Sequence, residues 1–462
     1  MSLLCFSTQV YFFVFGLSAY AIPIQDGATP VSHRRAAQAQ FTTSGNPAMQ
    51  NFTNVGFFSP EDVTKELKSV MVKYANADKV LAGVGLHPDT HPERGYPKFT
   101  PPSFLMSGAT QSSFDESAAG IIDVPPVAAG SGAVQMPLTD EISGSLDILY
   151  YGPMHFGTNQ TKMQIDVDTG SADLWVPVQC RNCVQEQYDT GQSSTYVPSK
   201  SKCKITYGVG QVAGTLAQDS VSVGPVGVNN QTFCAIHKVS EDLNEEPNSG
   251  LLGLAFGSIA QSGKPTFFEN LLAEKKLSSS IFSVHLTRLS ERGSEVCFGC
   301  FDPTRAVGPV NWNPVISRTY WSIAMDGLSV NGTQSPPANL TAAVDTGTSL
   351  IYLPTDVATD FYGMIPGSAA AVQYGAGFYT FPCDTPFSVS LVLGGQAYSV
   401  HPADFNLGRT DDDSSDCVGG ILALGNGFPP DLAIIGDEFL KSWYSVFDYS
   451  GRVGFAPSVN NK

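Results

Sequence analysis

Basic residues are scarce in this chain. Among its 462 residues, 25 Lys and Arg stand against 42 Asp and Glu, and the formal net charge is −17. Because a surface of this sign repels phosphates, we expect no nucleic-acid partner. The excess of acids fits work at low pH, where protonation removes much of the repulsion between carboxylates, and it fits solubility alone equally well.

Long apolar runs are also absent after the first 21 residues. We expect residues 1–21 to be a secretory signal peptide, because residues 11–17 form a short apolar core and Ala-Tyr-Ala at 19–21 is a small-x-small cleavage site, although no Lys or Arg precedes the core. The core is too short to span a membrane, and the carboxyl end lacks the hydrophobic tail of a lipid-anchored protein. We therefore expect a secreted protein without a membrane anchor, with a vacuole or another acidic organelle as the alternative destination.

Residues that would bind a metal are few and poorly spaced. Nine cysteines are present, and Cys5 leaves with the signal peptide, so an even number remains, as expected of disulfides. Two C-x-x-C pairs, at 180–183 and 297–300, could form a zinc site, but secretion and their wide separation favour disulfides. The acidic loop 411–416 lacks the Asp and Gly spacing of a calcium loop. We expect no metal and no cofactor.

Two matching stretches carry the main functional signal. Residues 165–177 (IDVDTGSADLWVP) and 342–354 (AAVDTGTSLIYLP) each run from an apolar strand through Asp-Thr-Gly into a second apolar run that ends in Pro. A single Asp-Thr-Gly is weak evidence, since Asp and Gly are ordinary turn residues. Two copies in matching context predict that Asp168 and Asp345 play equivalent parts.

A second element repeats in step with the first. An apolar-apolar-Gly segment follows each Asp-Thr-Gly turn, at 250–254 and at 433–437. The chain is therefore expected to fold as two similar halves, each of which brings one carboxylate to their junction. From Leu138 onward, short alternating runs punctuated by Gly, Pro and Asn predict mainly strands.

These residues resemble the pepsin-like aspartic proteases, including the secreted fungal members. The resemblance covers residues 146–458 and includes Tyr-Tyr-Gly-Pro at 150–153 and the closing segment 446–456. It implies an all-β, bilobal double-barrel fold with the active-site cleft between two homologous lobes, and hydrolysis of peptide bonds at acidic pH. The implied segments are a propeptide at 22–135, with its end between 124 and 136, an N-terminal lobe at 136–315 and a C-terminal lobe at 316–462.

The resemblance also implies a mechanism. Two facing carboxylates share one proton and titrate in two separate steps. The ionised member would act as general base on a water held between Asp168 and Asp345, and the protonated member would stabilise the oxyanion. We expect Ser171 and Thr348 to hydrogen-bond the outer carboxylate oxygens, Thr169 and Thr346 to grip each other across the junction, and glycines to permit the tight turns. The supporting residues are Thr169, Gly170, Ser171, Thr346, Gly347 and Thr348.

Residues 205–211 resemble the flap, a hairpin that closes over the substrate in this family. Tyr207 would hydrogen-bond Trp175 and cover the cleft, and Gly208 would let a substrate backbone approach closely. Val209 stands where some fungal relatives have an acid that accepts Lys. We therefore expect a preference for large apolar or aromatic residues on both sides of the cut bond, with poor cleavage after Lys.

The propeptide is expected to block the enzyme until acid releases it. A helix is predicted from Ser59, with Pro60 at its first position, and its basic residues can dock on the acidic body until acidification weakens the attraction. In the family, a prosegment Lys sits between the catalytic carboxylates, and Lys73 and Lys98 are the candidates here. Since no dibasic site lies near the end of the propeptide, we expect self-cleavage at low pH.

Covalent modifications are also implied. In the family, Cys180–Cys183 closes a loop after the first motif and Cys383–Cys417 bridges the second lobe. Cys203 and Cys234 flank the flap hairpin and can pair across adjacent strands, and Cys297 would pair with Cys300. Expected glycan sites are the sequons at Asn51, Asn159, Asn230, Asn331 and Asn339.

Two rival interpretations remain. A binding or inhibitor protein with a degenerate fold of this kind typically lacks a catalytic Asp or the flap Tyr, and this chain has them all. A glycoside hydrolase also uses two carboxylates, but it usually pairs them with stacking aromatics rather than with duplicated turns. The expected partners are peptide substrates and the chain's own propeptide, and we expect a monomer. Inhibition by a pepstatin-like compound separates the protease from both rivals.

Overall fold

The computed structural model of this chain describes residues 56–83, 132–207, 210–244, 247–425 and 428–461. The predicted signal peptide, Cys5, Asn51, Lys98, Gly208 and Val209 lie outside the described residues. No helix among the described residues is long and apolar enough to cross a membrane.

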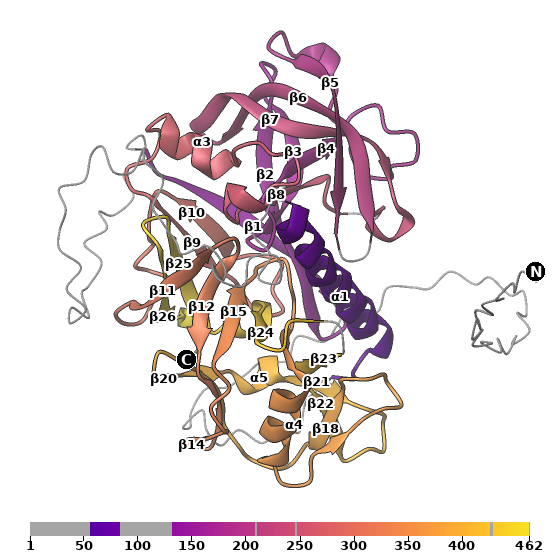
Figure 1. The fold of residues 1–462 in the computed structure, drawn as a ribbon, viewed down its shortest axis with the longest axis vertical. Coiled ribbons are helices and arrows are strands. Elements are labelled where there is room, and N and C mark those ends of the chain that lie inside the picture. The colour runs from indigo at the N-terminus through magenta and orange to yellow at the C-terminus, as the bar shows by residue number, and fades with distance from the viewer. Residues whose placement is uncertain (1–55, 84–131, 208–209, 245–246, 426–427, 462) are drawn as a thin grey trace, which may run out of the picture. The chain divides into compact units, whose positions relative to one another are not determined.

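Strands dominate the described residues, and the helices are few and mostly short, which confirms the expected all-β class (Figure 1). The α-helices are α1 (Pro60–Gly83), α3 (Phe267–Ala273), α4 (Thr355–Gly363), α5 (Pro402–Phe405) and α6 (Asp437–Leu440). Single 3₁₀ turns are η2 (Thr190–Gln192), η3 (Glu241–Leu243), η4 (Gly257–Ile259) and η5 (Val459–Asn461).

The strands fall into two sets along the chain, here called the first half and the second half. The first half has β1 (Val134–Ser143), β2 (Leu146–Phe156), β3 (Thr161–Asp168), β4 (Leu174–Pro177), β5 (Val197–Thr206), β6 (Gln211–Val223), β7 (Val226–Val239), β8 (Gly250–Gly253), β9 (Ile281–His285) and β10 (Ser294–Phe298).

The second half has β11 (Asn311–Arg318), β12 (Trp321–Met325), β13 (Gly327–Val330), β14 (Thr333–Gln334), β15 (Leu340–Val344), β16 (Ile351–Pro354), β17 (Ala369–Ala370), β18 (Tyr379–Pro382), β19 (Val389–Leu393), β20 (Gln396–Val400), β21 (Asn406–Arg409), β22 (Asp416–Gly419), β23 (Ile421–Leu424), β24 (Leu432–Ile435), β25 (Trp443–Asp448) and β26 (Arg452–Pro457).

The two halves repeat the same strand pairing. In the first half β3 lies parallel to β8, while β4 lies antiparallel to β8 and parallel to β7. In the second half β15 lies parallel to β24, while β16 lies antiparallel to β24 and parallel to β23. Every residue of β4, β8, β16, β23 and β24 is buried, which explains why these short parallel strands read as unbroken apolar runs. This repeat is the bilobal fold that the duplicated motifs predict.

A six-stranded antiparallel sheet joins the halves. Its strands run in the order β1, β10, β9, β25, β26, β11, so that strands from both ends of the chain meet at β9 and β25. One continuous apolar cluster extends through both halves, and the ring of Trp321 lies at its centre against Phe256, Phe282 and Phe447. The halves are thus fixed relative to each other by a shared core.

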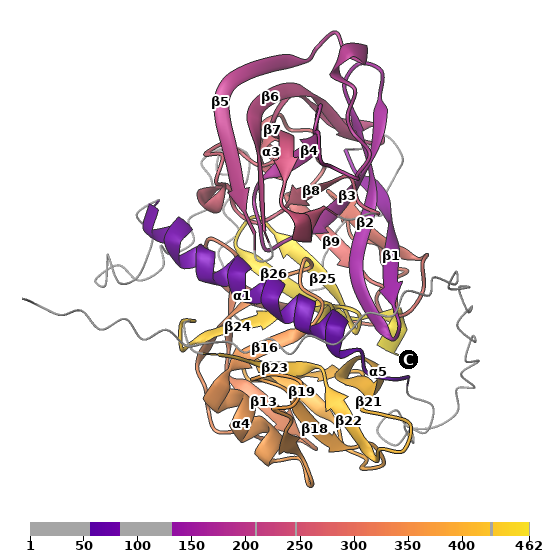
Figure 2. The ribbon, with the colours of Figure 1, turned by 90° about the vertical axis from the view of Figure 1, so that its right-hand side faces the viewer.

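Helix α1 lies between the two halves in both ribbon views (Figures 1 and 2). The Ser59 hydroxyl oxygen accepts a hydrogen bond from Asp62 N at 3.3 Å, which satisfies a free donor of the first turn. The apolar side chains of α1 recur at helical spacing and are buried against the second half. They are Val63, Leu67, Val70 and Tyr74.

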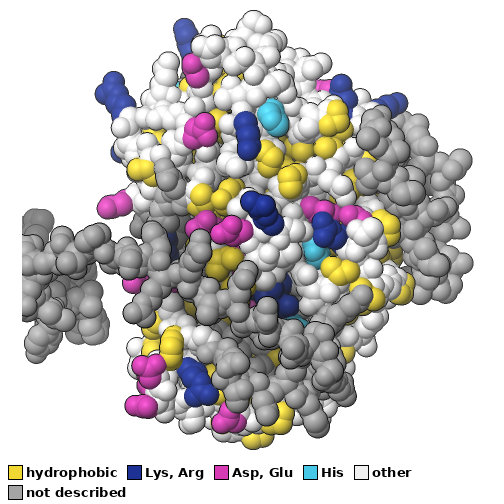
Figure 3. Space-filling model, turned by 180° about the vertical axis from the view of Figure 1, so that it is seen from behind, with side chains coloured by type: hydrophobic (Ala, Val, Ile, Leu, Met, Phe, Trp, Pro, Cys, Tyr) yellow, Lys and Arg dark blue, Asp and Glu magenta, His cyan; other side chains and the backbone are white. Residues whose placement is uncertain are grey.

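Charged side chains do not gather on the face shown in Figure 3. The described Lys and Arg residues there are scattered among acidic, apolar and uncharged ones, so the described residues visible on this face form no continuous basic track.

Candidate active site

The repeated strands bring the two acids together at the junction of the halves. Asp168 is the last residue of β3, and Asp345 directly follows β15. Backbone hydrogen bonds tie each to the neighbouring parallel strand region, from Leu254 N to Asp168 O at 2.8 Å and from Asp345 N to Ile435 O at 3.0 Å. The residues are only 2% and 0% exposed, so both carboxylates are held inside the molecule.

The glycines of the two turns are required by space. Gly170 N donates to Asp168 Oδ1 at 2.7 Å, and Gly347 N donates to Asp345 Oδ1 at 3.0 Å. A Cβ on Gly170 would overlap the carboxylate of Asp345, and a Cβ on Gly347 would overlap that of Asp168. Since neither glycine has a positive φ, the close approach of the opposite carboxylate explains these glycines better than the turn conformation does.

The two threonines of the motifs form a symmetric set of hydrogen bonds. Thr169 N donates to Thr346 Oγ1 at 3.1 Å, and Thr346 N donates to Thr169 Oγ1 at 3.0 Å. Each hydroxyl then donates across the junction, from Thr169 to Val344 O at 2.9 Å and from Thr346 to Val167 O at 2.7 Å. These buried bonds connect the two turns directly and restrict how far the acids can separate.

The next hydroxyls break the symmetry. Thr348 Oγ1 donates to Asp345 Oδ2 at 2.6 Å, the expected contact. The expected contact of Ser171 with Asp168 is absent, and Ser171 Oγ is buried without a hydrogen bond. Asp168 Oδ1 accepts from Gly170 N and from an ammonium group.

That ammonium belongs to Lys73 of α1. Its Nζ lies 2.8 Å from Asp168 Oδ1 and 3.0 and 2.8 Å from the two oxygens of Asp345. Of the two candidate lysines, Lys73 is thus the one placed between the carboxylates. The phenol of Tyr74 also donates to Asp345 Oδ2 at 2.9 Å, a contact that the sequence did not suggest because a Tyr on an apolar helix face is ordinarily a packing residue.

The two carboxylates have opposite pKa shifts. Burial raises the pKa of Asp168, and the nearby Asp345 raises it further against the opposing effect of Lys73. Burial also acts to raise the pKa of Asp345, but Lys73 and the hydrogen bonds from its neighbours, including Thr348, leave this pKa below its usual value. Burial opposes the charge on Lys73, yet the two carboxylates hold its pKa well above the ordinary range. The ammonium is therefore firmly charged while α1 is bound.

Glu66 is a further α1 contact that sequence reasoning missed. Its carboxylate accepts a hydrogen bond from Ser349 N at 2.7 Å, next to the second Asp turn. Burial raises the pKa of Glu66 to about 7, although this hydrogen bond and Lys73 oppose the shift. Because Glu66 and Lys73 are seven residues apart, both lie on the helix face that meets the cleft.

The hairpin of β5 and β6 brings Tyr207 against Trp175, which lies seven residues after Asp168. Trp175 Nε1 donates to the Tyr207 hydroxyl at 2.8 Å, and both residues are buried. Tyr207 N donates to Gly210 O at 2.8 Å, so the hairpin closes around the two residues that the structure does not describe. Gly208 and Val209, the expected tip, are those residues.

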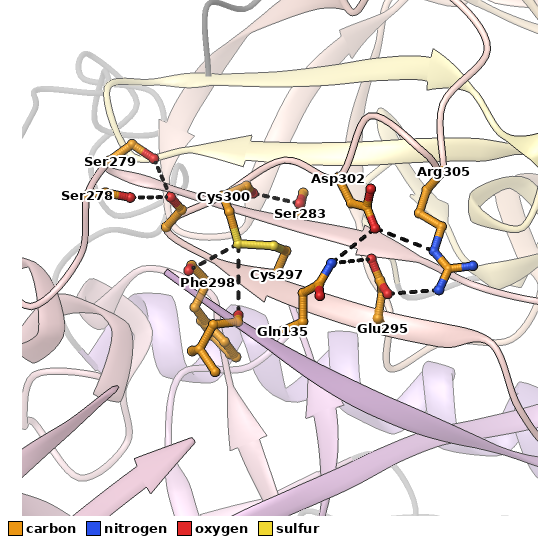
Figure 4. The surroundings of a disulfide bond; sticks show 12 residues. Gln135, Ser278, Ser279, Ser283, Glu295, Cys297, Phe298, Cys300, Asp302 and Arg305 are labelled. Carbon is orange, nitrogen blue, oxygen red and sulfur yellow. Dashed lines mark hydrogen bonds and ion pairs between the residues drawn. A yellow bond between two sulfur atoms is a disulfide. The ribbon is translucent and has the colours of Figure 1, made fainter. Parts of the chain in front are cut away.

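The structure joins the eight described cysteines into four disulfides, Cys180–Cys183, Cys203–Cys234, Cys297–Cys300 and Cys383–Cys417. Each C-x-x-C pair is closed on itself, which argues against a shared zinc site. Figure 4 shows Cys297–Cys300 beside Gln135 of β1, where Gln135 Nε2 donates to Asp302 Oδ2 at 3.0 Å. The disulfide therefore lies where the first strand joins the central sheet.

The described sequon residues Asn159, Asn230, Asn331 and Asn339 are all exposed.

Comparisons with known proteins agree with this geometry. The sequence model of the family described as "Eukaryotic aspartyl protease" matches residues 149–458. The chain is 36% identical to an "Aspartic protease" of Phaffia rhodozyma over 330 residues, which cover 70% of this chain and 78% of the relative. It is 34% identical to "Major aspartyl peptidase 1" of Cryptococcus neoformans var. grubii, over 68% of this chain and 69% of the relative. It is 32% identical to "Pepsin A" of Rhinolophus ferrumequinum, over 70% of this chain and 85% of the relative. The chain therefore belongs to the eukaryotic aspartyl protease family and is a hydrolase with aspartic-type endopeptidase activity.

Proposed function

We propose that this chain is an acid endopeptidase made as a zymogen, in which Asp168 and Asp345 activate the water that attacks the peptide bond. The observation that carries this proposal is the position of Lys73 Nζ, within 3.0 Å of both carboxylates. The ammonium stands where a water would be held in the active enzyme, because the same oxygens would accept its hydrogen bonds. While α1 is bound, neither water nor substrate can occupy this position.

The proposed reaction needs one charged and one neutral acid. The ionised carboxylate removes a proton from the water as its oxygen attacks the carbonyl carbon of the substrate. The protonated carboxyl donates a hydrogen bond to the oxyanion that forms on the carbonyl oxygen. A proton then passes to the amide nitrogen, and the carbon–nitrogen bond breaks. The dyad as a whole holds the shared proton, since two coupled carboxylates titrate together.

Residues 22–135 are the proposed propeptide, ahead of the lobes at 136–315 and 316–462. Because β1 begins at Val134 and pairs there with Phe298 of β10, a cut in the earlier part of the 124–136 window would leave this strand whole. Lys73 and Tyr74 would then leave the site with α1. Release of α1 would also expose the apolar residues against which it now packs, including Leu350 and Tyr352.

The vacated apolar surface supports the proposed preference for large apolar or aromatic residues around the cut bond. The exposed sequon residues and the four disulfides support a secreted glycoprotein. We propose that it acts as a monomer on peptide and protein substrates, and that self-cleavage in acid activates it.

One experiment tests the proposal as a whole. Purified full-length protein is acidified, casein digestion is followed, and the new amino terminus is identified by mass spectrometry. We expect acid to produce a pepstatin-sensitive enzyme that begins within residues 124–136. The Asp168→Asn and Asp345→Asn variants should remain unprocessed and inactive, and full hydrolysis by either of them would refute the mechanism.

A further inference from the structure

The base of the flap hairpin is bound by a side chain from outside the hairpin. Thr206 is the last residue of β5 and directly precedes Tyr207. Thr206 N donates to Gln261 Oε1 at 3.0 Å, and Gln261 Nε2 donates to Thr206 O at 3.1 Å. A carboxamide presents an acceptor and a donor side by side, as a peptide group does. The Gln261 side chain therefore pairs with Thr206 as a neighbouring strand would.

The loop that carries Gln261 is itself fixed to the first Asp motif. Gln261 N and Ser262 N donate to the two carboxylate oxygens of Asp173, at 2.8 and 3.0 Å. Asp173 is only 4% exposed and lies between the Asp168 turn and β4. Its carboxylate thus connects the loop rigidly to the segment that presents Asp168.

The flap is consequently tied twice to the same short segment. One tie runs from Tyr207 to Trp175 through a 2.8 Å hydrogen bond. The other runs from Thr206 through Gln261 to Asp173, two residues before Trp175. Two ties on adjacent flap residues fix both the position and the direction of the Tyr207 side chain, whereas one tie would leave the hairpin free to pivot.

We propose that Gln261 is a positioning residue that fixes Thr206 and Tyr207 of the flap hairpin against the segment that presents Asp168. This inference rests on the proposed peptidase function. Gln261 is exposed, so water competes for both of its bonds, and each contributes modestly. That weakness suits a tie that must break whenever the flap opens for substrate entry or product release.

A Glu at position 261 provides a test that a merely structural role would not pass. A protonated Glu carboxyl has one donor and one acceptor in nearly the same positions as the Gln amide, whereas an ionised Glu has acceptors only. The Gln261→Glu variant should therefore match the wild type well below the Glu pKa of about 4.3 and lose the bond to Thr206 O above it, while the bond from Thr206 N remains. We expect the ratio of its kcat/KM to that of the wild type to fall roughly three- to tenfold between about pH 3 and about pH 5.5, because the bond to Thr206 O is lost and a carboxylate oxygen then faces that carbonyl oxygen without a proton between them.

Other titratable groups near the tie require a reference at each pH. Asp173 accepts from Gln261 N and Tyr207 directly follows Thr206, while Lys204 on β5 and Lys264 lie within three residues of the tied pair in the sequence. Burial raises the pKa of Asp173, and hydrogen bonds from Ser262 and Gln261 N oppose this shift. Since these groups are present in wild type and variants alike, the ratio to wild type at each pH largely removes their common contribution.

Two further variants sharpen the comparison. Gln261→Ala should lower kcat/KM by a similar factor at every pH. Gln218→Glu is the matched control, because Gln218 is also exposed but hydrogen-bonds the Thr232 side chain, at 3.1 Å, rather than a flap residue, and its ratio should not change with pH. Hydrogen exchange of the Thr206 amide should quicken in Gln261→Ala.

Each outcome has a distinct meaning. A Gln261→Glu ratio that stays flat across this pH range, or an unchanged Thr206 exchange rate in Gln261→Ala, overturns the role of Gln261. Absence of acid peptidase activity in the processed wild type would instead overturn the proposed function on which this role depends.

Discussion

Replacement of Lys73 by Met tests the contact that closes the site. Met keeps the length of the side chain and removes the ammonium that lies within 3.0 Å of both carboxylates. Loss of one partner from a buried ion pair costs about 3–5 kcal/mol, and proton sharing between the two acids offsets part of that. The lower end, about 3 kcal/mol, corresponds to a rise of roughly a hundredfold in the fraction of molecules with α1 released.

The pH dependence should change as well. In the wild type, Lys73 and other neighbours hold the pKa of Asp345 below its usual value against the effect of burial. A carboxylate with a lowered pKa stabilises the closed form above its ordinary pKa, and this stabilisation is lost as the pH falls through the lowered value. For Asp345 alone, a fall in pH therefore favours opening, whereas the raised pKa values of Asp168 and of Glu66, the latter about 7, act in the opposite direction because burial in the closed form raises them. The Lys73→Met variant lacks the stabilisation through Asp345 and should begin processing at higher pH.

The assay is the rate at which α1-containing protein is converted, followed by gel and mass spectrometry from about pH 3 to about pH 7. Lys68→Met is the matched control, because Lys68 lies on the same helix and is exposed. Its processing should follow that of the wild type. If Lys73→Met needs the same acidity as the wild type, the ion pair does not govern opening.

Three further predictions concern contacts away from the dyad oxygens. Phe58→Ala should raise the pH at which processing begins without changing kcat of the processed enzyme, because the Phe58 ring packs on Tyr374 at 5.1 Å and leaves with the propeptide; a changed kcat would contradict this. Thr169→Val should destabilise the protein by about 2–4 kcal/mol in urea unfolding and lower kcat/KM, since it leaves Val344 O and Thr346 N without the Thr169 hydroxyl. Unaltered stability and activity would show that the hydrogen bonds between the two threonines do not hold the turns together. Double replacement of Cys297 and Cys300 by Ala should cost about 2 kcal/mol in the same unfolding assay, the value for so short a closed loop, and an unchanged midpoint would show that the disulfide does not stabilise β1.

The sequence predicts the fold well because the fold is duplicated. Short strands that are buried throughout follow each Asp-Thr-Gly turn. Such apolar strands can be recognised in the sequence before their partner strands are known. The repeat then indicates that one pairing pattern serves both halves, and the structure confirms it at β3 with β8 and at β15 with β24.

The residues that sequence reasoning missed act over long distances in the chain. Glu66 contacts Ser349, and Gln261 contacts Thr206, through single side chains with no periodic signal. A lone Glu on a helix or Gln in a loop is ordinarily solvated, so only the fold reveals its partner. The wrong expectation for Ser171 has the same origin, since its hydroxyl is equivalent to that of Thr348 in sequence but not in surroundings.

The contacts of the two acids also differ while α1 is bound. General acid–base chemistry needs one charged and one neutral carboxyl, and two identical turns would not favour either arrangement. Asp345 contacts Lys73 Nζ through both of its oxygens and also accepts bonds from the Thr348 hydroxyl and Gly347 N. Against the effect of burial, chiefly Lys73 holds the pKa of Asp345 below its usual value. Asp168 has only the backbone bond from Gly170 within its own turn, and burial leaves its pKa raised. The opposite pKa shifts therefore belong to the form in which Lys73 is bound, and the proposed release of α1 would remove the chief cause of the lowered pKa of Asp345.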